Sequence, residues 1–149
     1  MRTRILGLVV LTLVMVTTTF AKNIDENVNA KALSTFTQKF ADVKEVSWFK
    51  AENYYKATFK MNDQVYSAFI TEEGEWMGVS RNLVSYQLPI NLQADLKKEY
   101  GQYWITELFE FATEDQTYYY LTVENADQKV TLKSSGVSDW TTFKKVKKN

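Results

Sequence analysis

The sequence contains no cysteine and no histidine, and only one proline and five glycines among its 149 residues. Without cysteine the chain forms no disulfide and offers no thiol nucleophile, so its fold must be held together by packing. Without histidine or cysteine, it can build neither a metal site with nitrogen or sulfur ligands nor a histidine-based catalytic triad. We therefore expect no catalytic residues, no metal and no cofactor.

The charges balance, with 18 lysines and arginines against 18 aspartates and glutamates. This balance excludes the basic footprint of proteins that bind nucleic acid. The closest acidic groups are Glu72 with Glu73 and Glu75, Glu114 with Asp115, and Glu107 with Glu110. The first two groups fall in expected turns, and strand alternation would send Glu107 and Glu110 to opposite faces. A carboxylate-dependent glycan hydrolase, which needs two acids facing across a cleft, is kept as an alternative hypothesis.

Residues 1–21 have the pattern of a secretory signal peptide. Two arginines precede an apolar run from Ile5 to Val16, and Ala21 ends an acceptable cleavage site. The run is shorter than the roughly 18 apolar residues of a membrane span, and no later segment approaches that length. We expect residues 22–149 to be exported as a single domain without a membrane span. A cysteine-free exported chain favours the bacterial periplasm, with secretion as the alternative.

Two segments have apolar residues at helical spacing. The first, NAKALSTFTQKF, begins with Asn29 as the expected N-cap and carries an apolar stripe that ends at Phe40. The second, INLQADLKKEY, follows Pro89, and proline favours the first turn of a helix. Gly101 is expected to end this second helix.

After each predicted helix, the pattern changes to the alternation of apolar and polar residues that is typical of strands. The segments are VSWFK, YYKATFK, QVYSAFI and EWMGVS, then ITELFEF, TYYYLTV, QKVTLKS and DWTTFKKV. The connections are too short for parallel crossovers, so neighbouring strands should be antiparallel. We predict an α+β fold with a sheet of about eight antiparallel strands and both helices on one face.

The two halves also align with each other. YYKATF aligns with YYYLTV at an offset of 64 residues, and Trp76 aligns with Trp140 at the same offset. We interpret this as an internal duplication of a helix followed by four strands, with repeats at about 28–84 and 88–146. The two tryptophans are expected to pack into the cores of their halves.

The alternation within the strands divides their aromatic residues between two faces. In the repeat register Tyr55, Ala57 and Phe59 correspond to Tyr119, Leu121 and Val123, and these should face the helices. The candidate binding residues of the opposite, open face are Trp48, Tyr54, Lys56, Thr58, Tyr118, Tyr120 and Thr122.

These open-face residues have two interpretations. Tyrosine and threonine are good strand formers, and their cross-strand pairs stabilise an exposed sheet by roughly 0.2–1 kcal/mol each. Alternatively the face is a recognition surface, because aromatic side chains supply contact area at little entropic cost. For the face as a whole we favour binding to a protein or an envelope polymer, and a homodimer formed through the sheet is a further alternative.

An ordered series of residues also matches a family pattern. The series is Phe40, Val46, Trp48, Tyr55, Ala57, Phe59, Ala68, Gly74, Leu88, Pro89 and Tyr100. It resembles the beta-lactamase-inhibitor-like, PepSY-like proteins that Bacteroidetes export. The resemblance implies that residues 22–149 form a PepSY-like periplasmic domain, with a tandem helix-plus-meander fold and a concave sheet that grips a partner. It also implies no enzymatic activity.

Overall fold

The computed structural model describes residues 27–136 and 139–148, so the expected signal peptide lies outside the described residues. The elements in chain order are α1 (Ala30–Lys39), β1 (Val46–Lys50), β2 (Tyr54–Met61), β3 (Gln64–Thr71), β4 (Trp76–Asn82), the 3₁₀ helix η2 (Ser85–Gln87), α2 (Ile90–Tyr100), β5 (Trp104–Ala112), β6 (Thr117–Glu124), β7 (Gln128–Ser134) and β8 (Thr141–Lys147). Among the residues described, no helix has the length and apolar character needed to cross a membrane.

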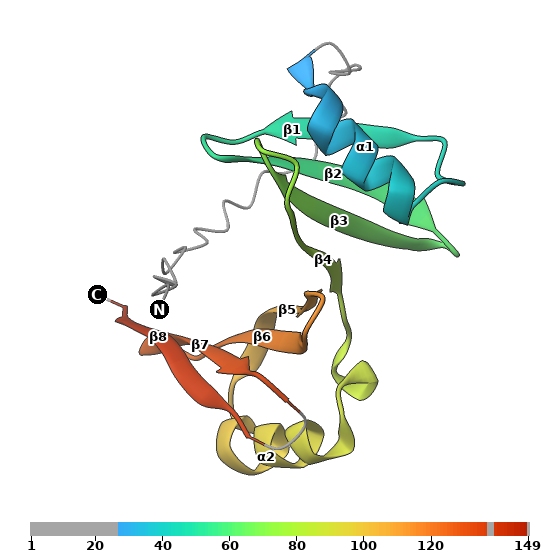
Figure 1. The fold of residues 1–149 in the computed structure, drawn as a ribbon. Helices are drawn as coiled ribbons and strands as arrows, with labels where there is room; N and C mark the ends of the chain where they lie inside the picture. Colours follow the sequence, from blue (N-terminus) through green and yellow to red (C-terminus); the bar gives the residue numbers. More distant parts are fainter. Residues whose placement is uncertain (1–26, 137–138, 149) are drawn as a thin grey trace, which may run out of the picture.

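The eight strands form one antiparallel sheet, and their order in the sheet is their order in the chain (Figure 1). The predicted α+β fold, with two helices and an open eight-stranded antiparallel sheet, is confirmed. Local sequence explains the tight turns. Asn62 and Asp63 take positive φ angles of 51° and 62° between β2 and β3, as a two-residue hairpin turn requires.

Helix α1 begins at its expected cap and is tied to a distant turn. The Asn29 side chain accepts a hydrogen bond from Ala32 N at 2.9 Å, and its amide donates to Glu72 O at 2.7 Å. Further along the helix, Thr35 Oγ1 donates to Gly74 O at 2.6 Å. These bonds hold α1 against the β3–β4 connection, so α1 lies across β1–β3 in Figure 1.

One hydrophobic cluster lies beneath α1. Its buried residues are Ala32, Phe36, Trp48, Tyr55, Ala57, Phe59, Ala68 and Ile70. The Phe36 ring makes edge-on contacts with Trp48 and Phe59, each at a centroid distance of 5.3 Å. Trp76 packs against the border of this cluster.

A second cluster lies beneath α2. Its buried residues are Leu83, Leu88, Leu92, Leu96, Leu108, Leu121, Val123, Val130 and Leu132. Trp140 packs against it and donates from its indole nitrogen to Leu92 O at 3.0 Å. Both Trp76 and Trp140 therefore have packing roles in their halves, while the duplication itself stays a prediction.

The strand pair β4–β5 joins the two halves of the sheet (Figure 1). Its register pairs run from Val79 with Ala112 to Asn82 with Phe109. The residues under α1 and those under α2 form separate clusters, so the two halves are joined at this strand pair and not by a shared cluster beneath the helices.

Candidate functional site: the aromatic face of the sheet

Two cross-strand rows of side chains define one face of the sheet. The first row is Phe49, Lys56, Phe69 and Gly78, from β1 to β4. The second row is Asn82, Phe109, Tyr120, Lys133 and Thr141, from β4 to β8. Side chains paired across antiparallel strands point to the same side, and Gly78 and Asn82 are an even number of residues apart in β4. Both rows therefore lie on one face, which we call the aromatic face.

The structure places six of the seven candidate binding residues on the aromatic face. They are Tyr54, Lys56, Thr58, Tyr118, Tyr120 and Thr122. All but Thr122 are half-buried, so part of each side chain is open to solvent.

The assignment of Trp48 to this face is wrong. Trp48 is paired with Ala57 and belongs to the cluster beneath α1, where only 6% of its surface is exposed. Ala57 is itself paired with Ala68, and these two small side chains leave room beneath Phe36 for the indole. The exposed aromatic residue of β1 is instead Phe49, at 51%.

The expected contact role of Thr122 is also corrected. Thr122 lies on the aromatic face by register, but it is only 2% exposed. Its hydroxyl donates to Glu107 Oε2 at 3.2 Å and shares a hydrogen bond of 3.2 Å with the Thr131 hydroxyl. Thr122 therefore links β5, β6 and β7 to one another rather than offering a surface to a partner.

In the N-terminal part of the aromatic face, three rings form a chain of contacts. Tyr54 packs against Phe69 at a centroid distance of 5.8 Å, and Phe69 meets Phe111 edge-on at 5.7 Å. The Phe111 ring lies over Gly78, where an added Cβ would come within 2.6 Å of its Cζ atom. Glycine at position 78 therefore lets a ring from β5 cover β4.

A second chain of contacts lies in the C-terminal part of the face. Phe109 stacks on Tyr120 at 5.0 Å, and Tyr120 meets Phe143 edge-on at 5.9 Å. The Lys133 ammonium lies 4.2 Å from the ring centre of Tyr118 and 5.4 Å from that of Tyr120. The positive charge is thus held over two aromatic rings, a geometry that cation–π attraction favours.

Besides Phe49, the sequence prediction missed four phenylalanines of this face. They are Phe69, Phe109, Phe111 and Phe143. Phe69 lies between two other apolar residues, Ala68 and Ile70, and all three are buried. The sequence there has no alternation of apolar and polar residues that would assign Phe69 to one face. Phe143 lies where the β7–β8 register shifts, and a bulge breaks alternation. Only Phe109 and Phe111, two residues apart in ITELFEF, carried a readable signal.

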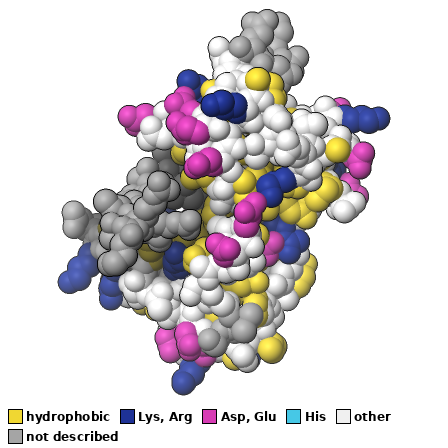
Figure 2. Space-filling model, viewed as in Figure 1, with side chains coloured by type: hydrophobic (Ala, Val, Ile, Leu, Met, Phe, Trp, Pro, Cys, Tyr) yellow, Lys and Arg dark blue, Asp and Glu magenta, His cyan; other side chains and the backbone are white. Residues whose placement is uncertain are grey.

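The aromatic face is more basic than the chain as a whole. By register it carries five lysines, Lys56, Lys60, Lys129, Lys133 and Lys144, and two glutamates, Glu107 and Glu124. Both glutamates are engaged within the protein, by the Thr122 hydroxyl and by Lys148 respectively. The Lys148 hydrogen bond lowers the pKa of Glu124. Figure 2 views the molecule from the side on which α1 lies in front of β1–β3, and there too hydrophobic side chains are interspersed with charged ones.

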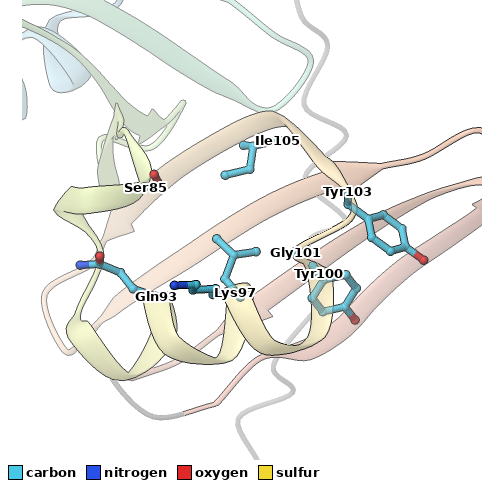
Figure 3. A pocket seen from close by; sticks show the side chains of 8 residues that line it. Ser85, Gln93, Lys97, Tyr100, Gly101, Tyr103 and Ile105 are labelled. Carbon is cyan, nitrogen blue, oxygen red and sulfur yellow. The ribbon is translucent and has the colours of Figure 1, made fainter.

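Two shallow cavities lie apart from the ring contacts of the aromatic face. The larger, about 240 Å³, is lined by Ser85, Gln93, Leu96, Lys97, Tyr100, Gly101, Tyr103 and Ile105 (Figure 3). The smaller, about 170 Å³, lies beside α1 and is lined by Leu33, Phe36, Thr37, Phe40, Ala41, Val43, Lys44, Val46 and Trp48. Neither lining contains a carboxylate, so neither cavity supplies the pair of acids that a glycan hydrolase requires.

The acidic groups do not converge elsewhere in the described part of the chain. Glu107 is paired with Thr122 and Glu110 with Tyr119, so the two glutamates point to opposite faces as expected. The other acidic groups lie in the β3–β4 and β5–β6 connections. Within residues 27–136 and 139–148, no group of acidic residues is arranged to hold a metal ion.

Comparison with known proteins identifies the fold. No family model and no curated protein sequence matches the chain. Among solved structures, a DUF2874 family protein from Bacteroides ovatus is 19% identical with a TM-score of 0.70, over 79% of this chain and 86% of that one. A protein from Bacteroides eggerthii with a proposed periplasmic location is 12% identical, with a TM-score of 0.70 over 80% and 88% of the two chains.

A BLIP-like protein from Bacteroides fragilis is also similar, at 16% identity and a TM-score of 0.63, over 77% of this chain and 86% of that one. The resemblance to beta-lactamase-inhibitor-like proteins of Bacteroidetes that the sequence predicts is therefore confirmed at the level of the fold.

Proposed function

We propose that this chain is a non-enzymatic, inhibitor-like binding module of the periplasm that engages a partner protein through its aromatic face. The observation that carries the proposal is the half-buried aromatic surface around Tyr120, with Phe109 stacked beneath it, Phe143 at its edge and Lys133 above it. Rigid aromatic side chains held by their neighbours lose little entropy on binding, and they are enriched where interfaces derive their affinity.

The location and the class of partner are supported by the structural neighbours. One neighbour has a proposed periplasmic location and another is BLIP-like, which favours a protein partner over an envelope polymer. The apolar run that follows Arg4 is consistent with export.

The duplicated architecture, with both helices on one face, is part of the same proposal. Ala57, in the cluster beneath α1, is next to Lys56 in β2, and Leu121, in the cluster beneath α2, is next to Tyr120 in β6. Since neighbouring residues in a strand point to opposite faces, both clusters lie opposite the aromatic face. This arrangement leaves the aromatic face uncovered by either helix and accessible to a partner.

The test uses the wild-type protein and its variants as baits to capture partners from a periplasmic extract. We expect wild-type protein to retain a partner that a Tyr118→Ser/Tyr120→Ser variant loses by at least about tenfold, as removal of interface anchors does. Tyr86, which is 77% exposed on η2, supplies the control, and Tyr86→Ser should retain the partner. Thermal unfolding of each bait separates lost binding from lost folding.

Two outcomes would overturn the proposal. If the double variant is folded and retains every partner of the wild type, the aromatic face is only a stabilising surface. If size-exclusion chromatography with light scattering shows a dimer that the double variant abolishes, the face serves self-association instead.

A further inference from the structure

The last strand of the sheet, β8, has an outer edge that pairs with no other described strand. In the strand order β8 is a neighbour of β7 alone, and all seven of its residues, Thr141–Lys147, are exposed. The opposite edge strand, β1, has only five residues, and its terminal Lys50 is paired with Glu72 at 2.9 Å. Of the two edge strands, β8 is therefore the longer. Among the residues described, none in β8 forms an ion pair, whereas Lys50 of β1 does.

The backbone of β8 presents hydrogen-bonding groups outward at defined positions. Lys148 N donates to Asp127 O at 2.8 Å, and the register next to it pairs Lys147 with Gln128. Along an antiparallel pair, successive residues alternate between bonding to the neighbouring strand and pointing away from it. Lys145 and Lys147 consequently direct their N–H and C=O groups to the open edge.

The same edge is strongly basic. Four of the five residues from 144 to 148 are lysines. Of these four, only Lys148 forms an ion pair with another described residue, Glu124. Lys144 is paired with Thr131 on the aromatic face, whereas Lys145 is paired with Val130 on the other side. Both sides of the β8 edge therefore carry uncompensated positive charge.

We propose that the β8 edge binds an extended acidic segment of a partner protein by strand addition, which goes beyond the function proposed for the aromatic face. Lysine on an edge strand normally discourages pairing, because a second strand of like charge is repelled. Against a second copy of β8 the lysines have that effect, whereas an acidic strand is attracted to them. A polypeptide, unlike an acidic polysaccharide, also satisfies the alternating backbone groups of Lys145 and Lys147.

Apolar groups along the edge would fix the register of the added strand. Phe143 is 55% exposed and Val146 is 46% exposed, and Lys144 and Lys145 lie between them in the chain. An incoming strand that places apolar side chains beside Phe143 and Val146 covers both, and its carboxylates then meet the intervening lysines. Main-chain bonds supply affinity in this mode, and the side chains supply specificity.

The first experiment uses a synthetic peptide of about eight residues, the length of an ordinary strand, built from glutamate, threonine and valine. We expect it to bind the wild-type protein and to lose at least about tenfold in affinity for Lys145→Glu/Lys147→Glu, because the charge attraction becomes repulsion. The charge-matched control is Lys44→Glu/Lys98→Glu, which changes two exposed lysines away from β8 and should leave affinity within about twofold.

The second experiment separates backbone pairing from charge. An N-methylated version of the peptide keeps its glutamates but loses its backbone donors, and we expect it not to bind. On the protein, Lys145→Pro removes the outward N–H, and it should bind more weakly than Lys145→Ala, which keeps it. In the wild-type complex, the amide protons of Lys145 and Lys147 should exchange more slowly than in the free protein.

Equal binding of the N-methylated peptide, or of a polyuronate, would overturn strand addition and leave only general attraction of polyanions. Equal weakening by the Lys44→Glu/Lys98→Glu control would do the same. If the peptide still binds the Tyr118→Ser/Tyr120→Ser variant, binding at the β8 edge does not depend on the aromatic face. Each of the two proposals can therefore fail without the other.

Discussion

The Arg81 guanidinium forms a two-bond ion pair with the Glu110 carboxylate across the β4–β5 junction. Arg81 Nε donates to Glu110 Oε1 at 2.6 Å, and the second bond measures 3.4 Å. Hydrogen bonding to Glu110 raises the pKa of Arg81, and burial acts in the opposite direction by disfavouring the charged guanidinium. Both side chains are mostly shielded from solvent, and they bridge the one strand pair that joins the two halves.

Removal of Arg81 should therefore weaken the junction. Arg81→Met leaves the Glu110 carboxylate half-buried without its partner, and we expect a loss of about 1–3 kcal/mol in the free energy of unfolding. Arg81→Met/Glu110→Leu should recover part of this loss, because no unpaired charge remains. Urea denaturation measures both variants.

The control for this pair is the exposed pair of Lys60 with Asp63. Lys60→Met should change stability by no more than about 0.5 kcal/mol, as is usual for a surface ion pair. A double variant at the junction that is no more stable than Arg81→Met alone would contradict the assignment of the loss to an unpaired charge.

Gly78 is the second feature of the junction that can be tested by mutation. Its φ is +153°, and an added Cβ would lie 2.6 Å from Phe111 Cζ and 2.7 Å from Ala112 O. The contact with backbone cannot be relieved by turning a side chain, so Gly78→Ala should destabilise the protein by about 1–3 kcal/mol or more. Gly136→Ala, where an added Cβ meets nothing within 4 Å, should be close to neutral.

Truncation of the Phe111 ring distinguishes the two clashes at Gly78. A Gly78→Ala/Phe111→Ala variant still has the contact with Ala112 O, so it should not regain the stability of Phe111→Ala alone. Full recovery, measured by thermal unfolding, would mean that the backbone at β4–β5 shifts freely.

The elements of the fold could be predicted because their local signals are strong and agree with one another. Asn29 caps α1 and Pro89 precedes α2, at the positions where the sequence places the helix starts. Tight turns such as Asn62-Asp63 allow only hairpin connections, so the antiparallel arrangement follows from the short length of the connections. These features depend on residues close in the sequence.

The composition of the aromatic face could not be predicted to the same extent, because it depends on cross-strand register. In VSWFK, the neighbours Trp48 and Phe49 are both apolar, and the strand alone does not say which one faces the core. The choice is decided by Ala57 and Ala68, whose small side chains make space under α1. Phe143 was missed for a similar reason, because the shift at the β7–β8 pair depends on both strands.

The corrected position of Trp48 leads to a direct comparison of adjacent residues. Trp48→Ala should lower the free energy of unfolding by about 3–5 kcal/mol, as for other buried aromatic residues. Phe49→Ala removes a side chain that is 51% exposed and should lower it by about 1 kcal/mol or less. Chemical denaturation of both variants checks this, and equal losses would contradict the assignment of Trp48 to the cluster beneath α1.

Stability at alkaline pH should depend on two tyrosines in the C-terminal half. Burial raises the pKa of Tyr119, with nearby Glu110 adding to the effect, and burial likewise raises the pKa of Tyr100, with Glu99 adding to it. A raised pKa in the folded state means that the unfolded chain loses its protons first. The stabilisation is therefore complete below about pH 10, the ordinary tyrosine value, and is lost as the pH rises through the folded-state pKa.

Replacement of both tyrosines by phenylalanine removes these ionisations, so Tyr100→Phe/Tyr119→Phe should lose less stability between about pH 9 and pH 11 than the wild type does. Tyr86→Phe, at an exposed tyrosine, should follow the wild-type curve. Urea denaturation at a series of pH values measures the slopes. An unchanged slope in the double variant would mean that the alkaline loss arises elsewhere, for example at Lys50, whose pKa is raised by its hydrogen bond to Glu72.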